Sequence, residues 1–260
     1  MFDDNKLYWD KRAKKYGHTG WAAEEIYAFD QKIRINVIKS FMEKHNFLKD
    51  GKILDYGGGD GTFAQALAPL CNEYYYYDLS EEVTKLAKKR LSDYTNIKYL
   101  YNLKEIKTCE KFNFIIAITV FQHILDDKDL VDTLSLLNSK LTDNGKLLIL
   151  EDTFEKQDRQ NEYIHYRTIN EFEDLIKESG FHSFQSKGFY HPINNPTEGY
   201  IHYKNSFPII LYKSVRKLSR GKLLLHTDFD KLACKYIGNI EDYVMEPMDN
   251  DISRIFIAEK

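Results

Sequence analysis

Cysteine is scarce in this chain: the 260 residues include three, Cys71, Cys109 and Cys234. Their number is odd, and their spacing is not that of metal ligands. The sequence therefore predicts neither a disulfide framework nor a metal site, and it favours a reducing compartment.

Long hydrophobic runs are missing as well. The longest, Phe112 to Phe121, is far shorter than the roughly 20 residues that cross a bilayer. The first residues, Met1 to Lys6, are acidic and polar and lack the basic and then apolar order of a signal peptide. We therefore expect a cytoplasmic protein that has no membrane partner.

Charge of one sign does not dominate, since the formal net charge is -3 at pH 7. A nearly neutral chain has no global attraction to nucleic acids or membranes. The length suffices for one large domain with a sizeable core, or for a core with a small lid. No internal repeat or low-complexity tract interrupts it.

A short apolar run leads into a glycine turn at residues 53–61, ILDYGGGDG, and Asp78 closes the next predicted strand. In parallel α/β sheets this order makes a nucleotide-type pocket, in which the acid at the strand end accepts hydrogen bonds from ribose hydroxyls. Asp55 would repel a pyrophosphate but would suit a cation. Because Thr62 replaces the third glycine of the dinucleotide fingerprint, a cationic adenosyl ligand is favoured over NAD.

Strands and helices alternate after Gly51, which predicts a mostly parallel sheet with right-handed crossovers. The predicted strands are 53–56, 74–77, 97–101, 112–118, 146–150, 181–187 and 252–258. Three predicted helices cover residues 6–16, 22–45 and 62–70. A fourth begins after the N-cap Ser80, and a fifth is buried through Leu130, Leu134, Leu137 and Leu141. A sixth begins with a capping box at Thr168 to Glu171. Asn144-Gly145 is expected to be the turn before the fifth strand.

Four segments follow from this pattern. They are an N-terminal helical cap (1–50), a core (51–187), a lid insert (188–250) and the last core strand (251–260). The insert is too long for a bare loop. Its first half is basic, which indicates either a solvated charged face or a site for a phosphate or pyrophosphate on the substrate.

The ordered motifs resemble those of the seven-stranded (class I) S-adenosylmethionine-dependent methyltransferases. The resemblance extends from about Gly51 to Leu150 and rests on the turn Leu54-Asp55-x-Gly57-x-Gly59-x-Gly61, on Asp78 and on the strand that begins at Phe112. It implies a Rossmann-like α/β fold with helices on both faces of a seven-stranded sheet, N-terminal helices and an insert before the last strand. It also implies the cofactor S-adenosyl-L-methionine.

In such a pocket Gly57 and Gly59 would let the backbone approach the methionine part of the cofactor. Asp55 would hold the loop or the ammonium group, and Asp78 would bind both ribose hydroxyls. The remaining cofactor candidates are Leu79 and Leu103 around the adenine, Asn102 at its amino group, Thr119 near the methyl, Arg34 at the carboxylate, and Tyr16 or Trp21 over the sulfonium.

Two histidines are candidates for a general base. His123 follows the fourth strand, and an imidazole with an unperturbed pKa of about 6.5 can take a proton at neutral pH; the resemblance also allows a His here that only braces the loop. His18 lies between two glycines and two aromatic residues in a loop that could instead anchor the N-terminus. No metal is expected.

Missing motifs narrow the reaction that the resemblance implies. Residues Ala117 to Phe121 contain neither the Asn/Asp-Pro-Pro-aromatic motif of the family's amino-methylating nucleic acid and glutamine enzymes nor the Pro-Cys pair of a cysteine-adduct cytosine mechanism. Thr119 stands where metal-dependent members usually carry an acid. We therefore expect O-methylation of a small polar acceptor, such as a phosphorylated or nucleotide-linked sugar. The alternatives are an RNA or protein methyltransferase and a non-catalytic S-adenosylmethionine-binding module. The oligomeric state is not predicted.

Overall fold

The computed structural model describes residues 2–19, 24–44, 51–154, 162–189 and 253–260. Its strands are β1 (Lys52–Tyr56), β2 (Glu73–Tyr77), β3 (Ile97–Leu100), β4 (Phe112–Ile118), β5 (Leu141–Asp152), β6 (Ser183–Phe189) and β7 (Ser253–Glu259). Its helices are α1 (Phe2–Tyr16), α2 (Glu24–Lys44), α3 (Thr62–Leu67), α4 (Glu81–Arg90), α5 (Leu103–Thr108), α6 (Asp127–Ser139) and α7 (Ile169–Glu178), with short 3-10 turns η1 (Ala68–Leu70) and η2 (Phe121–His123).

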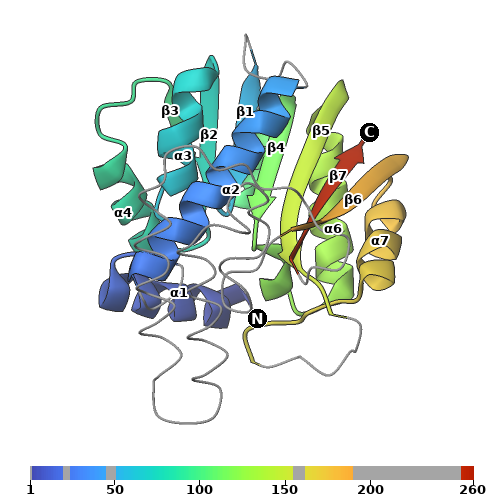
Figure 1. Ribbon diagram of the computed structural model, residues 1–260, viewed down its shortest axis with the longest axis horizontal. Helices are drawn as coiled ribbons and strands as arrows, with labels where there is room; N and C mark the ends of the chain where they lie inside the picture. The colour runs from blue at the N-terminus through green and yellow to red at the C-terminus, as the bar shows by residue number, and fades with distance from the viewer. Residues whose placement is uncertain (1, 20–23, 45–50, 155–161, 190–252) are drawn as a thin grey trace, which may run out of the picture. The chain divides into compact units, whose positions relative to one another are not determined.

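The seven strands form one sheet in the order β3-β2-β1-β4-β5-β7-β6 (Figure 1). β1 pairs in parallel with both β2 and β4, and the outer pairs β2–β3 and β4–β5 are parallel too. The strand order changes direction between β1 and β4. Ligands of open α/β sheets bind at such a point, beyond the carboxyl ends of the strands.

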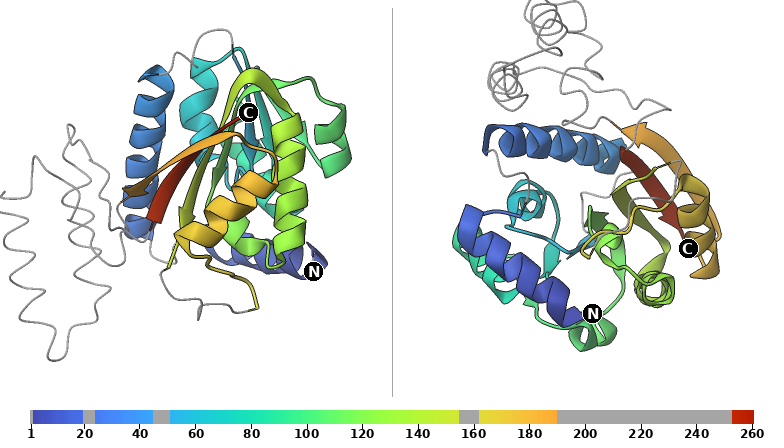
Figure 2. Two further views of the ribbon diagram at one scale, coloured as in Figure 1. Left: turned by 90° about the vertical axis from the view of Figure 1, so that its right-hand side faces the viewer. Right: turned by 90° about the horizontal axis from the view of Figure 1, so that it is seen from below.

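Helices cover both faces of the sheet, as predicted. Alternate strand residues point to opposite faces, and Ile115 of β4 belongs to a buried cluster with side chains of α5, α6 and α7. Its neighbour Phe114 points the other way and stacks on Phe41 of α2 at a centroid distance of 6.1 Å. Figure 2 shows α6 and α7 side by side on their face.

Four consecutive tyrosines make up most of β2, and all are buried. Tyr75 and Tyr77 join the cluster under α5 and α6, so Tyr74 and Tyr76 face the other way. A buried hydroxyl requires a hydrogen-bond partner. Tyr74 donates to the Asp55 carboxylate at 2.8 Å, and Tyr76 donates to the carbonyl of Gly59 at 2.5 Å. The strand therefore holds the end of β1 and the turn that follows it.

Most predicted elements are confirmed within one or two residues, but the region before the fifth strand is wrong. Leu141 was assigned to the helix that is now α6; instead it begins β5 opposite Phe112 and is fully buried. The predicted turn at Asn144-Gly145 lies inside this strand, next to a register shift between Phe112 and Phe114. The cause is that Leu141 fits the apolar spacing of a helix but fills the same core from a strand.

The first helix is docked on the fourth (Figure 2). Asp10 of α1 accepts hydrogen bonds from the Ser80 hydroxyl at 2.5 Å and from the N–H of Glu82 at 3.3 Å. Ser80 is itself the predicted N-cap and accepts from the N–H of Val83 at 3.1 Å. Asp10 thus satisfies another free N–H in the first turn of α4 and places a carboxylate at its positive end.

We expect Asp10→Ala to lower the free energy of unfolding by about 1–2 kcal/mol, because it removes these two hydrogen bonds at a helix N-terminus. Urea denaturation of the full-length protein measures the loss. Asp10→Asn keeps an acceptor oxygen and should lose less. An unchanged midpoint for Asp10→Ala would show that the contact does not stabilise the fold.

Two compact units make up the chain. One comprises Met1–Thr19, Lys39–Ser186 and Arg254–Lys260, and the other comprises Gly20–Ile38 and Lys187–Ser253. Most of the predicted lid insert lies outside the described residues, so the four-segment division stays a prediction. None of the helices in the described ranges combines the length and hydrophobicity that a bilayer crossing requires.

Candidate functional site

The glycine turn after β1 depends on left-handed backbone conformations. Gly57, Gly59 and Gly61 have φ angles of 79°, 59° and 82°, which residues with a Cβ rarely adopt. The N–H groups of Gly57 and Gly58 both donate to the carbonyl of Tyr77, at 2.8 and 2.9 Å. The turn is therefore anchored to the end of β2, where Asp78 follows.

Close packing leaves no room for side chains in this turn. A Cβ on Gly58 would lie 2.5 Å from the ring of Tyr76 and 2.9 Å from Asp55 Oδ2. A Cβ on Gly57 would lie 2.5 Å from Cγ2 of Val120, in the segment after β4. The turns after β1 and β4 therefore touch at the point where the strand order reverses, and the backbone of the turn is bare.

Asp55 is buried, with 2% of its surface exposed. Its Oδ2 accepts from the Tyr74 hydroxyl. Burial raises the pKa of Asp55 to about 7, and the nearby charge of Asp78 adds to the effect. A carboxylate that is costly to ionise gains most from a ligand that brings positive charge.

Asp78 holds the glycine turn on one side and the start of α4 on the other. Its Oδ2 accepts from the N–H of Gly59 at 3.0 Å and its Oδ1 from the N–H of Ser80 at 2.9 Å. Burial raises the pKa of Asp78 to about 6, and the charge of Asp10 contributes. Each carboxylate oxygen has a second lone pair, so both oxygens can still accept a hydrogen bond from a bound hydroxyl.

The segment after β4 contains a strained residue. Thr119 has φ 52°, the one positive φ of a residue other than glycine in the described ranges, and a β-branched residue is disfavoured there. Its N–H donates to the carbonyl of Leu150 at 2.7 Å. Strain of this kind persists where the surroundings hold it, and it clusters at functional sites.

Glu151, at the end of β5, is one such support. Its carboxylate accepts from the N–H groups of Val120 at 2.7 Å, Phe121 at 2.6 Å and Gln122 at 3.3 Å. Burial, together with the charge of Asp152, raises the pKa of Glu151 to about 8, although these N–H groups favour the ionised form. From the sequence, the place of Glu151 and Asp152 at the end of the fifth strand suggests acceptor ligands or a base. The contacts of Glu151 with backbone groups on another strand leave no signal in the sequence.

His123 has a lower pKa than the sequence predicts. Burial lowers it from 6.5 to about 4, so the imidazole is neutral at physiological pH. Nδ1 lies 2.9 Å from the carbonyl oxygen of Tyr163, which can only accept; Nδ1 therefore carries the hydrogen and Nε2 the lone pair. Nε2 lies 3.3 Å from Nε2 of Gln122. His123 is a weaker base than expected.

The first helix reaches this segment too. Asn5 donates to the carbonyl of His123 at 2.7 Å, and the ring of Trp9 packs edge-on against the imidazole at 4.8 Å. Tyr8 stacks on Tyr163 at 4.3 Å. These contacts brace the loop around His123, and both roles of its imidazole, as a base and as a brace, stay predictions.

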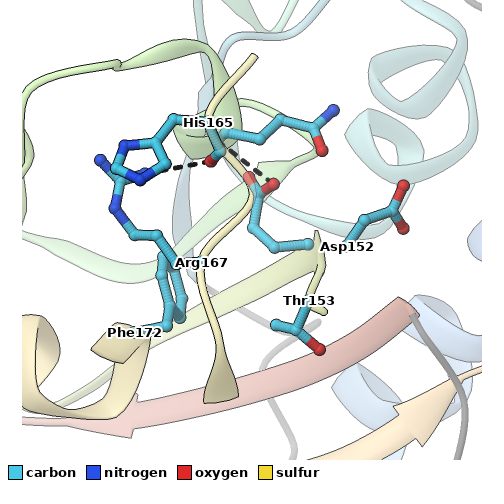
Figure 3. A pocket seen from close by; sticks show the side chains of 7 residues that line it. Asp152, Thr153, His165, Arg167 and Phe172 are labelled. Atoms are coloured by element: carbon cyan, nitrogen blue, oxygen red, sulfur yellow. Dashed lines mark hydrogen bonds between the residues drawn. The ribbon is translucent and has the colours of Figure 1, made fainter. Parts of the chain in front are cut away.

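A small pocket lies beside Glu151 (Figure 3). It is lined by Gln122, Glu151, Asp152, Thr153, His165, Arg167 and Phe172. The Arg167 guanidinium is already engaged: it donates to Asp127 Oδ1 and to the carbonyl of Ile124, each at 2.8 Å. This cation of the pocket is therefore neutralised in place by Asp127.

The N-terminal loop lies near the glycine turn, since a Cβ on Gly59 would come within 3.1 Å of Thr19 Oγ1. His18 is buried next to this contact. The ring of Tyr16 is approached by Arg12 and Lys15 of its own helix, at 5.2 and 4.9 Å. Its contact with a sulfonium stays a prediction.

Of the five remaining cofactor candidates, four are placed less directly and one is not described. Asn102 is exposed and caps α5, a helix that the sequence did not predict, by accepting from the N–H of Glu105 at 3.1 Å. The predicted hydrogen bond from the adenine amino group would have to use the same Asn102 oxygen. Leu103 packs against the core, and Leu79 is partly buried. Arg34 is a buried residue of the second unit, and Trp21 lies outside the described residues.

Several residues that shape the site escaped sequence analysis. Gly58 was read as a variable position of the motif, and Tyr76 only as part of a strand. The available signal was the four-tyrosine run itself, because a buried strand that carries so many hydroxyls must place them on acceptors. In the described ranges, no group of His, Cys, Asp and Glu side chains is arranged to hold a metal ion.

A family model described as "Methyltransferase domain" matches residues 31–187, more than half of the chain. An uncharacterized methyltransferase of Staphylococcus carnosus is 26% identical over 130 residues, 50% of this chain and 60% of that protein. The match therefore spans less than two thirds of that relative's length. An uncharacterized methyltransferase of Alkaliphilus oremlandii is 24% identical over 214 residues, 80% of this chain and 92% of that protein.

Solved structures share the fold. Haemonchus contortus phosphoethanolamine N-methyltransferase 2, solved with phosphomonomethylethanolamine and S-adenosylhomocysteine, superimposes with a TM-score of 0.59 at 18% identity, covering 98% of this chain and 60% of that chain. Magnesium protoporphyrin IX methyltransferase of Synechocystis PCC 6803, solved with bound S-adenosylmethionine, gives a TM-score of 0.56 at 16% identity, covering 72% and 88%.

Proposed function

The chain belongs to the methyltransferase-domain family, and from this premise we propose that it moves a methyl group from S-adenosylmethionine to an oxygen atom of a small polar acceptor. The observation that carries the proposal is the bare glycine turn held between two carboxylates, of which Asp55 is buried and Asp78 half-buried. Asp55 and Asp78 both have raised pKa values, and a cationic nucleoside would relieve the cost of ionising them.

The residues fit this cofactor. Gly57 and Gly58 allow the turn to pack tightly on Val120 and Tyr76, and at Gly59, where Thr19 Oγ1 is the only atom of the described residues within 4 Å of a Cβ, the bare backbone would let a ligand approach. Asp78 would bind the ribose hydroxyls through its second lone pairs, and Asp55 would favour the ammonium group through its charge. S-adenosylmethionine supplies a methyl group bound to a positively charged sulfur. The sulfur is the leaving group, and its positive charge activates it.

The Thr119–His123 segment, at the neighbouring strand end, would border the acceptor. Alignment and exclusion of water are the main requirements of an in-line displacement. For a hydroxyl acceptor a proton must also leave, and Nε2 of His123 could take it once its lone pair is released from the Gln122 amide, which lies 3.3 Å away. A pKa of about 4 makes His123 a weak base that releases the proton readily.

An acceptor that carries a phosphate is the more specific form of this proposal. It is supported by the basic first half of the insert, with Lys204, Lys213, Arg216, Lys217, Arg220 and Lys222. A structural neighbour from Haemonchus contortus was solved with phosphomonomethylethanolamine, so this fold accommodates an acceptor with a phosphate group. Oxygen is favoured over nitrogen because Thr119 and its neighbours lack the Pro-Pro-aromatic motif.

An acceptor screen tests the proposal. The full-length protein is incubated with S-adenosylmethionine that carries a deuterated methyl group and with phosphorylated sugars, nucleotide sugars, their unphosphorylated counterparts, phosphoethanolamine, RNA and protein. We expect label on an oxygen of a phosphorylated small molecule, located by mass spectrometry and NMR. Label on nitrogen or in a polymer would overturn the acceptor assignment, and tight cofactor binding with no labelled product would favour a non-catalytic module.

Cofactor binding should weaken as the pH falls. The ribose hydroxyls of S-adenosylhomocysteine would bind Asp78 as a carboxylate, and its ammonium group would favour Asp55 as a carboxylate. The pKa values of about 6 and about 7 mean that both groups take up protons below neutrality. Binding must then displace those protons, so we expect affinity for S-adenosylhomocysteine to fall at least about tenfold from pH 7 to pH 5. Calorimetry in two buffers of different ionisation enthalpy measures the proton release. An affinity that does not change with pH would contradict the assignment.

A further inference from the structure

Glu151 is positioned to control the backbone of the segment that follows β4. It is 2% exposed, and its two oxygens receive the N–H groups of three successive residues, Val120 to Gln122. No helix or sheet ladder would satisfy these donors, because the segment has just left β4. The turn η2 keeps its own hydrogen bonds, from the N–H groups of His123 and Ile124 to the carbonyls of Val120 and Phe121. The single buried carboxylate satisfies the N–H groups that precede them.

The residue before this turn is the strained one. Thr119 is held at φ 52° by two hydrogen-bonding residues of β5. The carbonyl of Leu150 accepts from its N–H, and the carboxylate of Glu151 accepts from the N–H groups of the next three residues. Removal of either set of hydrogen bonds would let Thr119 relax to a negative φ. The chain beyond it would then rotate, including Val120, whose side chain lies against Gly57.

A second support holds the far end of the segment. The N–H of His165 donates to the carbonyl of Gln122 at 2.8 Å, and Arg167 donates to the carbonyl of Ile124. These residues fix the carbonyl side, whereas Glu151 fixes the N–H side. The segment is therefore clamped by groups of opposite polarity, and Glu151 is the acceptor half of the clamp.

We propose that Glu151 is a positioning residue for methyl transfer: it holds the strained Thr119–His123 segment in the conformation that lines up the acceptor with the cofactor. The inference rests on the proposed function, since that segment is taken to border the acceptor. It assigns no proton transfer to Glu151, because the backbone donors already occupy its oxygens.

The test is a double-mutant cycle between Glu151 and Thr119 in the full-length protein. Glu151→Gln is isosteric but presents an NH₂ group to backbone donors. We expect turnover with the acceptor from the screen to fall about tenfold or more, with S-adenosylhomocysteine affinity within about twofold of the wild type. Thr119→Gly removes the strain, so in that background Glu151→Gln should cost about threefold or less.

Amide hydrogen exchange supplies a readout that needs no acceptor. Exchange at residues 120–122 should be slow in the wild type and faster in Glu151→Gln, with exchange elsewhere in β4 and β5 unchanged. Asp126→Asn is the matched control: it makes the same acid-to-amide change at the exposed N-cap of α6, where Asn caps equally well, and it should match the wild type in all assays.

Three outcomes would overturn the inference. They are an equal loss of turnover in both Thr119 backgrounds, a loss that follows cofactor affinity or global unfolding, and unchanged exchange at 120–122 in Glu151→Gln. If the screen finds no acceptor, the proposed function fails, but the exchange experiment still decides whether Glu151 holds the segment.

Discussion

Replacing Asp78 with alanine is expected to weaken the binding of S-adenosylhomocysteine by about 1.5–3 kcal/mol, roughly 10- to 150-fold in Kd. The reason is the loss of a half-buried, charged acceptor at the place where the ribose would lie. The variant also leaves the N–H groups of Gly59 and Ser80 without the acceptor that they now share. Isothermal titration calorimetry measures the affinity.

Two comparisons separate the ribose contact from a folding defect. Urea denaturation reports how much stability Asp78→Ala loses without ligand, and only a loss of affinity in a fully folded sample counts. Asp143→Ala is the control, since the Asp143 side chain is 93% exposed and its carboxylate forms only a long ion pair, at 3.7 Å, with Lys111. This variant should bind S-adenosylhomocysteine with wild-type affinity. If Asp78→Ala keeps the wild-type affinity, Asp78 does not bind the ribose.

Gly58→Ala should destabilise the fold by about 2–3 kcal/mol, the upper range for overpacking a rigid site. The added methyl would come within 2.5 Å of the Tyr76 ring. That ring cannot retreat easily, because it is fully buried and its hydroxyl is bonded to the carbonyl of Gly59. The variant should also bind cofactor poorly, since relief of the clash must move the turn or the strand beside it.

Gly17→Ala separates the steric effect from the loss of glycine's backbone freedom. Gly17 has a φ of 72°, but no atom of the described residues lies within 4 Å of its hypothetical Cβ. The free energy of unfolding should therefore fall only by the cost of holding alanine in the left-handed conformation, about 1 kcal/mol. Thermal and urea unfolding of both variants give the comparison. If Gly58→Ala were as stable as Gly17→Ala, the Tyr76 ring would have to be mobile.

Local signals accounted for most of the elements. Ser80 and the capping box at Thr168–Glu171 act through hydrogen bonds to residues three positions away, and apolar runs such as Phe112–Ile118 mark buried strands wherever they pair. These features are encoded within a few residues, so they can be read before the fold is known. The resemblance extended the reading to the cofactor and to Asp78 at a strand end.

The errors share one cause, which is partners distant in the chain. Leu141 matches a helical stripe, but pairing with Phe112 places it in a strand. α5 buries one residue, Ile106, over six positions, too few for a periodic signal. The imidazole of His123 has an ordinary pKa in an isolated sequence, and only packing against Trp9 and the surrounding chain removes the water that would stabilise its charge.

The amino-acid sequence by itself determined the order of the seven strands and of every helix except α5, the glycine turn and the acid that follows the second strand, because each depends on neighbours along the chain. Only the tertiary structure decided that Tyr76 closes the turn around Gly58, that the pKa values of the buried acids rise, and that Glu151 holds the segment after β4. Those properties arise from burial and from hydrogen bonds between strands that meet only when the sheet forms.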